Sequence, residues 1–355
     1  MKFESLHRVL KNQYPSRRPA FIWGPPGIGK SSVIENVAAD LGIAHMVISL
    51  TALDPVDLRG MPHLVKGKMK FAPMMQLPTE GEGILLLDEL ANADIGVQVA
   101  CYQLLLERRI GEYTLPDGWH VVAAGNRETD GCLTQQMSSA AANRMVHIEL
   151  EPCMDAWLKW AAVKNIHESI LAYLSFRRIH KVDYQNEYHN DYADTHIQYP
   201  DCGMLFYMPK DLGDGAKKGF ASPRSWEMVD EHLKHQNIVD LAELIKGTVG
   251  ERVSTEFMGF LRLYKDIPDV KEIFKNPTTA PLTENMSGRY AITCLIANNF
   301  TKKNLAAGKT YLDRMNSKEL TTLAMTMACN KHPELKQSGT WITWAVDNQK
   351  DLATA

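Results

Sequence analysis

The stretch Gly24-Pro-Pro-Gly-Ile-Gly-Lys-Ser31 decides how the rest of the chain is interpreted, because it fits the spacing G-x-x-x-x-G-K-[ST]. A short apolar run, Ala20–Trp23, precedes it, and residues 32–41 carry aliphatic side chains at helical spacing. Glycines let such a loop fold tightly, so that its backbone N–H groups surround a phosphate at the positive end of the next helix. The sequence therefore predicts a strand, a phosphate-binding loop and a helix.

The predicted nucleotide contacts are the residues of this loop and its first neighbour: Gly24, Pro25, Pro26, Gly27, Ile28, Gly29, Lys30, Ser31 and Ser32. Lys30 can reach the β- and γ-phosphates, and the Ser31 hydroxyl can bind Mg²⁺. A nucleoside triphosphate with Mg²⁺ is the expected ligand.

Length and composition fit a chain of two domains with a sizeable core, since it has 355 residues and 45% hydrophobic content. The net charge of −3 gives no global electrostatic reason to bind nucleic acid. The six cysteines are scattered without a C-x-x-C pair, which favours buried free thiols. Residues 1–14 do not resemble a signal peptide, and no apolar run is long enough to span a bilayer. We expect a reducing, soluble, cytoplasmic setting without a membrane.

The run Ile84-Leu-Leu-Leu-Asp-Glu89 predicts a strand buried on both faces of a parallel sheet and ending in two carboxylates. Ligands of open α/β sheets bind at the carboxyl ends of such strands. Asp88 is therefore predicted to hold Mg²⁺, and Glu89 to polarise the attacking water.

A second buried run, Val121-Val-Ala-Ala-Gly-Asn126, ends in an amide. Asn126 can hydrogen-bond the γ-phosphate or the lytic water, although an ordinary turn asparagine is the alternative. With further strands expected at 45–50 and 145–150, strands and helices alternate through residue 150. This alternation predicts an α/β fold with a five-stranded, mainly parallel sheet.

Two hairpins interrupt the alternation. Val65–Phe71 alternates around a basic, Gly-containing turn, and is either a solvated surface hairpin or a loop that contacts a partner. Ile110–Val122 is expected to turn at Pro116-Asp117-Gly118.

The chain beyond Glu151-Pro152 is predicted to be helical. Residues 182–219, rich in Asp, Tyr, His and Asn, are expected to form a long surface insertion. The spacing of His180, His189 and His196 fits no standard metal site, which favours solvated histidines. Ser222 and Pro223 predict a helix start, from which Arg224 would project.

The order of these motifs, GPPGIGKS, ILLLDE, VVAAGN, AANRM and ASPRSW, resembles the AAA+ ATPases, and within them the MoxR-type group related to the CbbQ-like ATPases. The resemblance covers residues 17–264. It implies a P-loop AAA+ α/β core at residues 1–152, an all-α lid at 153–265 and, beyond the family pattern, a helical C-terminal extension at 266–355. The insertion at 182–219 departs from the family pattern.

The resemblance also implies roles for individual residues. Lys30 and Ser31 match the Walker A motif, and Asp88 and Glu89 match Walker B. The remaining matches are Asn126 to sensor 1, Arg224 to sensor 2 in the lid, and Arg144 to the arginine finger that a subunit supplies to its neighbour. Arg108, Arg109 and Arg127 are rival candidates for the finger, and Arg144 could instead be a surface arginine at a helix end.

By resemblance, the expected function is Mg²⁺-dependent ATP hydrolysis at the subunit interfaces of a homo-oligomeric ring, with six subunits expected. The two hairpins match insertions that line or cap the ring's pore. The expected output is chaperone-like remodelling of a protein client, with a separate partner that carries a von Willebrand A domain. The alternative is a motor or loader acting on nucleic acid, in which Lys66, Lys68 and Lys70 contact phosphates. A nucleotide-dependent scaffold without hydrolysis is disfavoured by the full set of catalytic residues.

Overall fold

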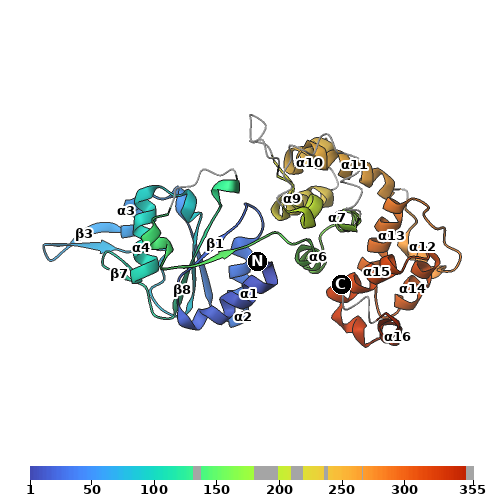
Figure 1. Cartoon of the computed structure of the whole chain (residues 1–355), viewed down its shortest axis with the longest axis horizontal. Helices are drawn as coiled ribbons and strands as arrows, with labels where there is room; N and C mark the ends of the chain where they lie inside the picture. Colours follow the sequence, from blue (N-terminus) through green and yellow to red (C-terminus); the bar gives the residue numbers. More distant parts are fainter. Residues whose placement is uncertain (131–136, 180–198, 209–218, 236–238, 266, 349–355) are drawn as a thin grey trace. The chain divides into compact units, whose positions relative to one another are not determined.

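The chain forms two compact units, Met1–Pro152 and Cys153–Ala355, in the computed structural model (Figure 1). The structure describes all residues except 131–136, 180–198, 209–218, 236–238, 266 and 349–355. Each unit contains its own hydrophobic cluster. In the described part of the chain, no helix combines the length and the apolar character that crossing a bilayer requires.

The first unit is built on a five-stranded sheet in the order β2-β5-β8-β1-β9, in which every strand pair is parallel. Its strands are β1 (Ala20–Trp23), β2 (Ala44–Ser49), β5 (Gly83–Asp88), β8 (Trp119–Gly125) and β9 (Val146–Glu149). The central strands β5 and β8 are almost wholly buried, as their uninterrupted apolar runs predict. The predicted five-stranded sheet is confirmed.

The strand register aligns the carboxyl ends of four strands at one edge of the sheet. Trp23 lies opposite Gly125, and Ser49 lies opposite Asp88. The segments that follow β1, β2, β5 and β8 therefore begin at the same level.

Helices cover both faces of this sheet. They are α1 (Phe3–Gln13), α2 (Lys30–Leu41), α3 (Pro55–Arg59), α4 (Ile95–Glu107) and α5 (Ser139–Ala142). On one face, α4 buries Val97, Cys101 and Leu104 against alternate residues of the central strands. On the other face, α2 packs on β2 and β5, with α1 behind it. Asp94 and Ser138 cap α4 and α5 by accepting hydrogen bonds from backbone N–H groups.

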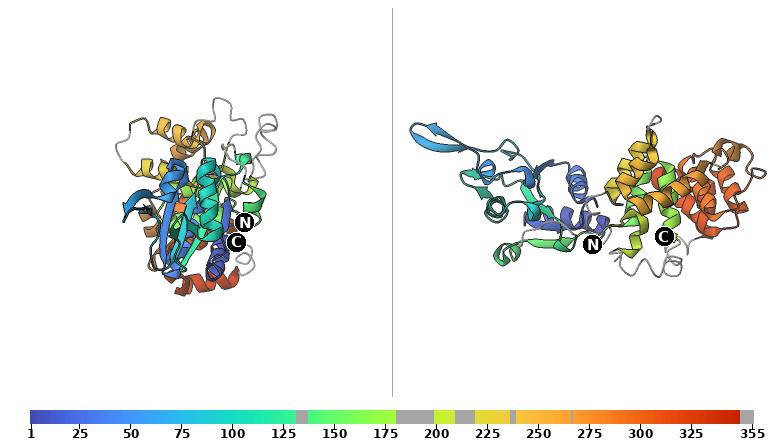
Figure 2. Two further views of the ribbon diagram at one scale, coloured as in Figure 1. Left: turned by 90° about the vertical axis from the view of Figure 1, so that its left-hand side faces the viewer. Right: turned by 90° about the horizontal axis from the view of Figure 1, so that it is seen from above.

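The first predicted hairpin is an isolated two-stranded ribbon of β3 (Met61–Val65) and β4 (Lys68–Ala72), which projects from the unit (Figures 1 and 2). The second predicted hairpin turns at a different position, so the prediction of a turn at Pro116-Asp117-Gly118 is wrong. Strands β6 (Arg109–Ile110) and β7 (Tyr113–Thr114) turn at residues 111–112, where Gly111 has a φ of +57°. Pro116-Asp117-Gly118 instead leads into β8, because the residues that follow it belong to the central sheet.

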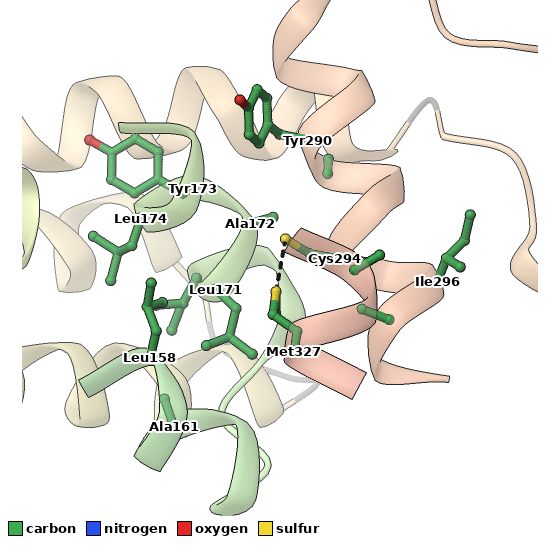
Figure 3. Packing of buried hydrophobic residues seen from close by; sticks show 14 of the residues in the cluster. Leu158, Ala161, Leu171, Ala172, Tyr173, Leu174, Tyr290, Cys294, Ile296 and Met327 are labelled. Atoms are coloured by element: carbon green, nitrogen blue, oxygen red, sulfur yellow. Dashed lines mark hydrogen bonds between the residues drawn. The ribbon is translucent and has the colours of Figure 1, made fainter. Parts of the chain in front are cut away.

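The second unit is helical in its described residues. Its α-helices are α6 (Met154–Val163), α7 (Glu168–Ile179), α9 (Pro223–Lys234), α10 (Leu241–Val249), α11 (Glu251–Lys265), α12 (Val270–Lys275), α13 (Met286–Asn298), α14 (Leu305–Arg314), α15 (Lys318–Lys331) and α16 (Gly339–Asp347). Figure 3 shows α7, α13 and α15 meeting in its core, where the Cys294 thiol lies 3.8 Å from the sulfur of Met327. Residues on both sides of position 265 thus contribute to a single hydrophobic cluster.

The tract expected to be a surface insertion is partly buried. The 3₁₀ helix η5 (Pro200–Leu205) places Met204 and Leu205 in the core, and Phe206 follows at 2% exposure. Trp226 of α9 donates its indole N–H to the carbonyl of Met204 at 2.9 Å. The expectation that residues 182–219 lie on the surface is therefore wrong for this segment. Three histidines weighed as metal ligands, at positions 180, 189 and 196, lie outside the described residues.

His120 is a buried titratable group at the start of β8, with no exposed surface. Its Nε2 lies 2.7 Å from the carbonyl oxygen of Arg18, while Nδ1 has no hydrogen-bond partner among the described residues. The neutral ring therefore carries its proton on Nε2. Burial lowers the pKa of His120 to about 4.

This pKa predicts acid sensitivity of the fold. The unfolded chain binds the proton near pH 6.5 and the folded chain only near pH 4, so stability is lost as the pH falls between these values. At pH 5 the loss relative to pH 8 is about 2 kcal/mol. We expect His120→Gln, which keeps a donor for the Arg18 carbonyl, to flatten the dependence of thermal unfolding on pH. An equally steep dependence in this variant would contradict the assignment.

Candidate nucleotide-binding site

The loop between β1 and α2 has the backbone that a phosphate cradle requires. Gly29 has a φ of +93°, in the region that favours glycine, and Lys30 begins α2 directly after it. A Cβ on Gly24 would lie 2.7 Å from the carbonyl oxygen of Leu150, so only glycine fits there. The N-terminus of α2 therefore faces the loop, where its partial positive charge favours an anion.

Lys30 lies at the centre of this loop and is surrounded by oxygen atoms. Its ammonium group donates to the carbonyls of Gly24 and Pro25, at 2.7 and 3.1 Å, and to Oδ1 of Asn126 at 2.7 Å. Asn126 directly follows β8, and its contact with Lys30 joins two predicted site residues that are distant in sequence. A phosphate carries the same kind of acceptor oxygens, so the cradle fits a nucleotide triphosphate chain.

Ser31 and Asp88 form the second contact of the site. The Ser31 hydroxyl donates to Oδ2 of Asp88 at 2.8 Å, and the backbone N–H of Glu89 donates to Oδ1 at 3.0 Å. A hydroxyl and a carboxylate are the oxygen ligands that Mg²⁺ prefers. The pair predicted from sequence to bind the metal therefore fits it.

Glu89 has a left-handed backbone with a φ of +62°, which is uncommon for a residue other than glycine. This conformation ends β5 and begins the 3₁₀ helix η3 (Leu90–Asn92). Oε2 of Glu89 accepts a hydrogen bond from the Thr51 hydroxyl at 2.7 Å. The turn and the hydroxyl together fix the direction of the carboxylate.

Thr51 is a site residue that the sequence did not identify. It follows β2, which pairs directly with β5, and the opposition of Ser49 and Asp88 brings Thr51 to the level of Glu89. Its sequence signal is a polar residue that follows a strand. This signal does not identify Thr51 as a neighbour of Glu89, because the sequence does not show that β2 lies beside β5.

Arg144 lies at the amino-terminal end of the sheet's strands, whereas the phosphate-binding loop lies at their carboxyl end. It precedes β9, whose first residue, Val146, pairs with Ala20 at the start of β1. The length of β1 separates the two ends by roughly 13 Å, at about 3.3 Å for each residue of the strand. Arg144 is exposed and follows the short helix α5.

The three rival arginines differ in how their guanidinium groups are held. Arg108 donates to the carbonyls of Trp119 and Pro116, at 2.9 and 2.7 Å. Arg127 pairs with the buried Asp130 at 3.0 Å and with Glu149 at 3.6 Å. These contacts bind both arginines within their own unit. Arg109 is exposed and pairs with Glu107 at 2.8 Å.

Arg109 and Arg144 share a neighbouring carboxylate. Hydrogen bonds from Arg109 and Gln103 lower the pKa of Glu107, and the charge of Arg144 lowers it further. Glu107 also lines a groove of about 350 Å³, whose walls on α3 and α4 include Arg59, Val99, Tyr102 and Leu106. Val99 of this groove is 61% exposed. The surface beside Arg144 thus combines apolar and cationic groups.

Arg224 belongs to the second unit, where it is the second residue of α9. Ser222 caps this helix by accepting a hydrogen bond from the backbone N–H of Ser225, and Pro223 occupies its first turn, as predicted. The Arg224 side chain is exposed. Its proposed approach to the γ-phosphate stays a prediction.

Comparison with known proteins gives one family. Residues 20–148 match the family described as "ATPase family associated with various cellular activities (AAA)". The match extends from β1 to β9 and includes the loop, Asp88, Glu89, Asn126 and Arg144. No curated protein matches the chain.

Several solved structures are similar to the chain at low sequence identity. A mutant of RuvB from Thermotoga maritima is 15% identical over 78% of this chain and 76% of its own, with a TM-score of 0.38. A putative ATPase from Cytophaga hutchinsonii is 14% identical over 92% of this chain and 79% of its own, with a TM-score of 0.35. NtrX from Brucella abortus is 15% identical over 46% of this chain, with a TM-score of 0.32, and the match spans 41% of the NtrX chain.

Proposed function

Residues 20–148 form an AAA ATPase domain, and we propose on this basis that the chain hydrolyses ATP at the subunit interfaces of a hexameric ring. The observation that carries the proposal is the separation of Arg144 from the cradle of its own subunit. A site that holds Lys30, Asp88, Glu89 and Asn126 receives its finger arginine from the adjacent subunit.

Within one subunit, each residue has a distinct task. Lys30 leaves its present acceptors and binds the β- and γ-phosphate oxygens. Ser31 and Asp88 hold Mg²⁺, which neutralises charge on the phosphates when bound. Glu89 orients the attacking water, and Asn126 hydrogen-bonds this water or the γ-phosphate. Most of the rate enhancement comes from such placement of charge and hydrogen-bond donors.

Arg144 is the preferred finger among the four arginines. Arg108 and Arg127 hold backbone carbonyls or carboxylates of their own unit, whereas Arg144 is exposed and its charge acts on Glu107, which lines the groove on α4. We propose that the groove contacts the neighbouring copy, because the exposed Val99 in its mixed lining suits burial against another chain and the nearby Arg144 suits that copy's bound phosphates.

The proposed work of the ring is remodelling of a protein client. Cross-strand partners in the β3–β4 ribbon lie on the same face of the ribbon. One face carries Leu64 and Met69, which are 76% and 62% exposed, and the opposite face carries Lys68 and Lys70 together with Met61, which is 74% exposed. Phosphate contacts would use only the lysines, whereas a protein partner also accounts for the exposed apolar side chains on both faces.

The choice between protein and nucleic acid can be tested by stimulation of ATP hydrolysis. We expect an unfolded model protein, β-casein, to stimulate hydrolysis several-fold, and Leu64→Asp with Met69→Asp to remove the effect because it places charge on the apolar face. Lys68→Glu with Lys70→Glu is the matched variant of the other face. Stimulation by single-stranded DNA that disappears at high salt and in the lysine variant would instead support the nucleic-acid motor.

Three finer assignments belong to the same proposal. The motif order supports membership of the MoxR-type group, and with it a separate partner bearing a von Willebrand A domain. Arg224 would couple nucleotide state to the lid, residues 153–265, with residues 266–355 as an extension. A cytoplasmic location agrees with the free cysteines, of which Cys101, Cys202, Cys294 and Cys329 are buried and Cys153 is half-buried among the described residues.

A further inference from the structure

Trp23 and His147 form a side-chain contact between β1 and β9 that the proposed mechanism does not use. The indole N–H of Trp23 donates to Nδ1 of His147 at 2.9 Å. The two rings are nearly parallel, with centroids 6.1 Å apart and an interplanar angle of 15°. The ring of Phe21 stacks on the ring of Trp23, with their centroids 4.1 Å apart.

This contact fixes the tautomer of the neutral His147 imidazole. An indole N–H can only donate, so Nδ1 of His147 must be the acceptor. The proton of the neutral imidazole then lies on Nε2, which is 2.9 Å from the carbonyl oxygen of Ala142. Trp23 thus prepares His147 to donate to Ala142, and both hydrogen bonds run in one direction.

These two hydrogen bonds link Trp23, beside the phosphate-binding loop, to Ala142, beside Arg144. Trp23 directly precedes Gly24, the first residue of the phosphate-binding loop. Ala142 is the last residue of α5, two positions before Arg144. Its carbonyl also accepts the backbone N–H of Met145, at 3.3 Å, so it closes the turn that carries Arg144.

We propose that Trp23 and His147 are positioning residues, which hold the turn of Arg144 in the orientation that the neighbouring subunit's site requires. This inference rests on the proposed role of Arg144 at that site. His147 is exposed on the edge strand β9, so burial of its ring does not explain the two hydrogen bonds. They order a short turn that only four helical residues precede.

Mixed assemblies test the inference. Lys30→Ala subunits serve as finger donors, because they lack the nucleotide-binding lysine but retain Arg144. Arg144→Ala subunits serve as site donors, since they retain the cradle. The activity of the mixture then measures how well Arg144 of the Lys30→Ala subunits acts on the sites of the Arg144→Ala subunits.

His147→Phe removes both hydrogen bonds and retains an aromatic ring for stacking. In the finger donor it is expected to lower the activity of the mixture about two- to tenfold, the worth of one or two hydrogen bonds. In the site donor it should have no effect. His147→Gln in the finger donor keeps a donor for the Ala142 carbonyl and should restore most of the activity, which a loss of folding could not explain.

The outcomes separate this inference from the proposed function. An equal loss in both subunits, or no loss in the finger donor, would overturn the positioning role while the trans action of Arg144 stands. A mixture of the parent Lys30→Ala and Arg144→Ala subunits that stays inactive although subunits exchange would refute the trans action itself, and the inference with it.

Discussion

Replacing Glu89 by Gln is expected to lower the rate of ATP hydrolysis by about 10²–10⁴-fold without loss of ATP binding. The amide has the shape of the carboxylate and can still accept the hydrogen bond of Thr51. It cannot accept a proton from water, so only the chemical step suffers. The left-handed backbone of Glu89 and the Lys30 cradle are unaffected by this change.

The measurement is phosphate release at saturating ATP, paired with equilibrium binding of ATP. Glu82→Gln is the matched control, because Glu82 is an exposed carboxylate directly before β5. Turnover close to that of the unchanged chain would remove Glu89 from the role of base. We expect the variant also to retain ATP-bound assemblies, so that copurifying proteins would identify a client, and a von Willebrand A domain among them would support the MoxR-type assignment.

Arg144→Ala should lower hydrolysis by about 10³–10⁵-fold, the effect of an arginine finger on phosphoryl transfer. The loss arises because charge that develops on the transferred phosphoryl has no counter-charge from the adjacent subunit. The cradle of the variant is intact, so a finger from another chain can act on it. Mixing with Lys30→Ala subunits should therefore restore part of the activity.

Two measurements accompany this variant. Arg109→Ala is the matched control, since Arg109 shares Glu107 with Arg144 and is equally exposed. Size measurements with and without a slowly hydrolysed ATP analogue should show assembly favoured by nucleotide. A strict monomer in every condition would contradict the ring, and full activity of Arg144→Ala alongside an inactive Arg109→Ala would transfer the finger to Arg109.

The α/β P-loop AAA+ fold could be predicted from sequence, and it is confirmed. The reason is that buried parallel strands are short apolar runs with few alternatives, and the polar residues that end them are conspicuous. Asp88 and Asn126 were predicted as site residues in this way. Glycine spacing located the loop, in which Gly29 supplies a left-handed backbone and Gly24 leaves room for the carbonyl of Leu150.

Other features depend on pairing and packing that sequence does not express. Pro116-Asp117-Gly118 has the composition of a hairpin turn, yet the strand that follows joins β5 and β1 instead of folding back. The buried Met204 and Leu205 follow a polar tract, whose composition concealed their packing against α7 and α9. Thr51 meets Glu89, and His147 meets Trp23, only because of the strand order.

The cradle and Arg144 lie at opposite ends of the strands of one sheet, and this placement determines how many complete active sites an assembly contains. Contacts of this kind are head-to-tail, and they propagate until the rotation between copies closes them. An open chain of n subunits would contain n − 1 complete sites. The subunit at one terminus would have a cradle that receives no arginine, and the subunit at the other would have an arginine that reaches no cradle. Closure adds the last site, so specific activity per subunit would report whether the circle is complete.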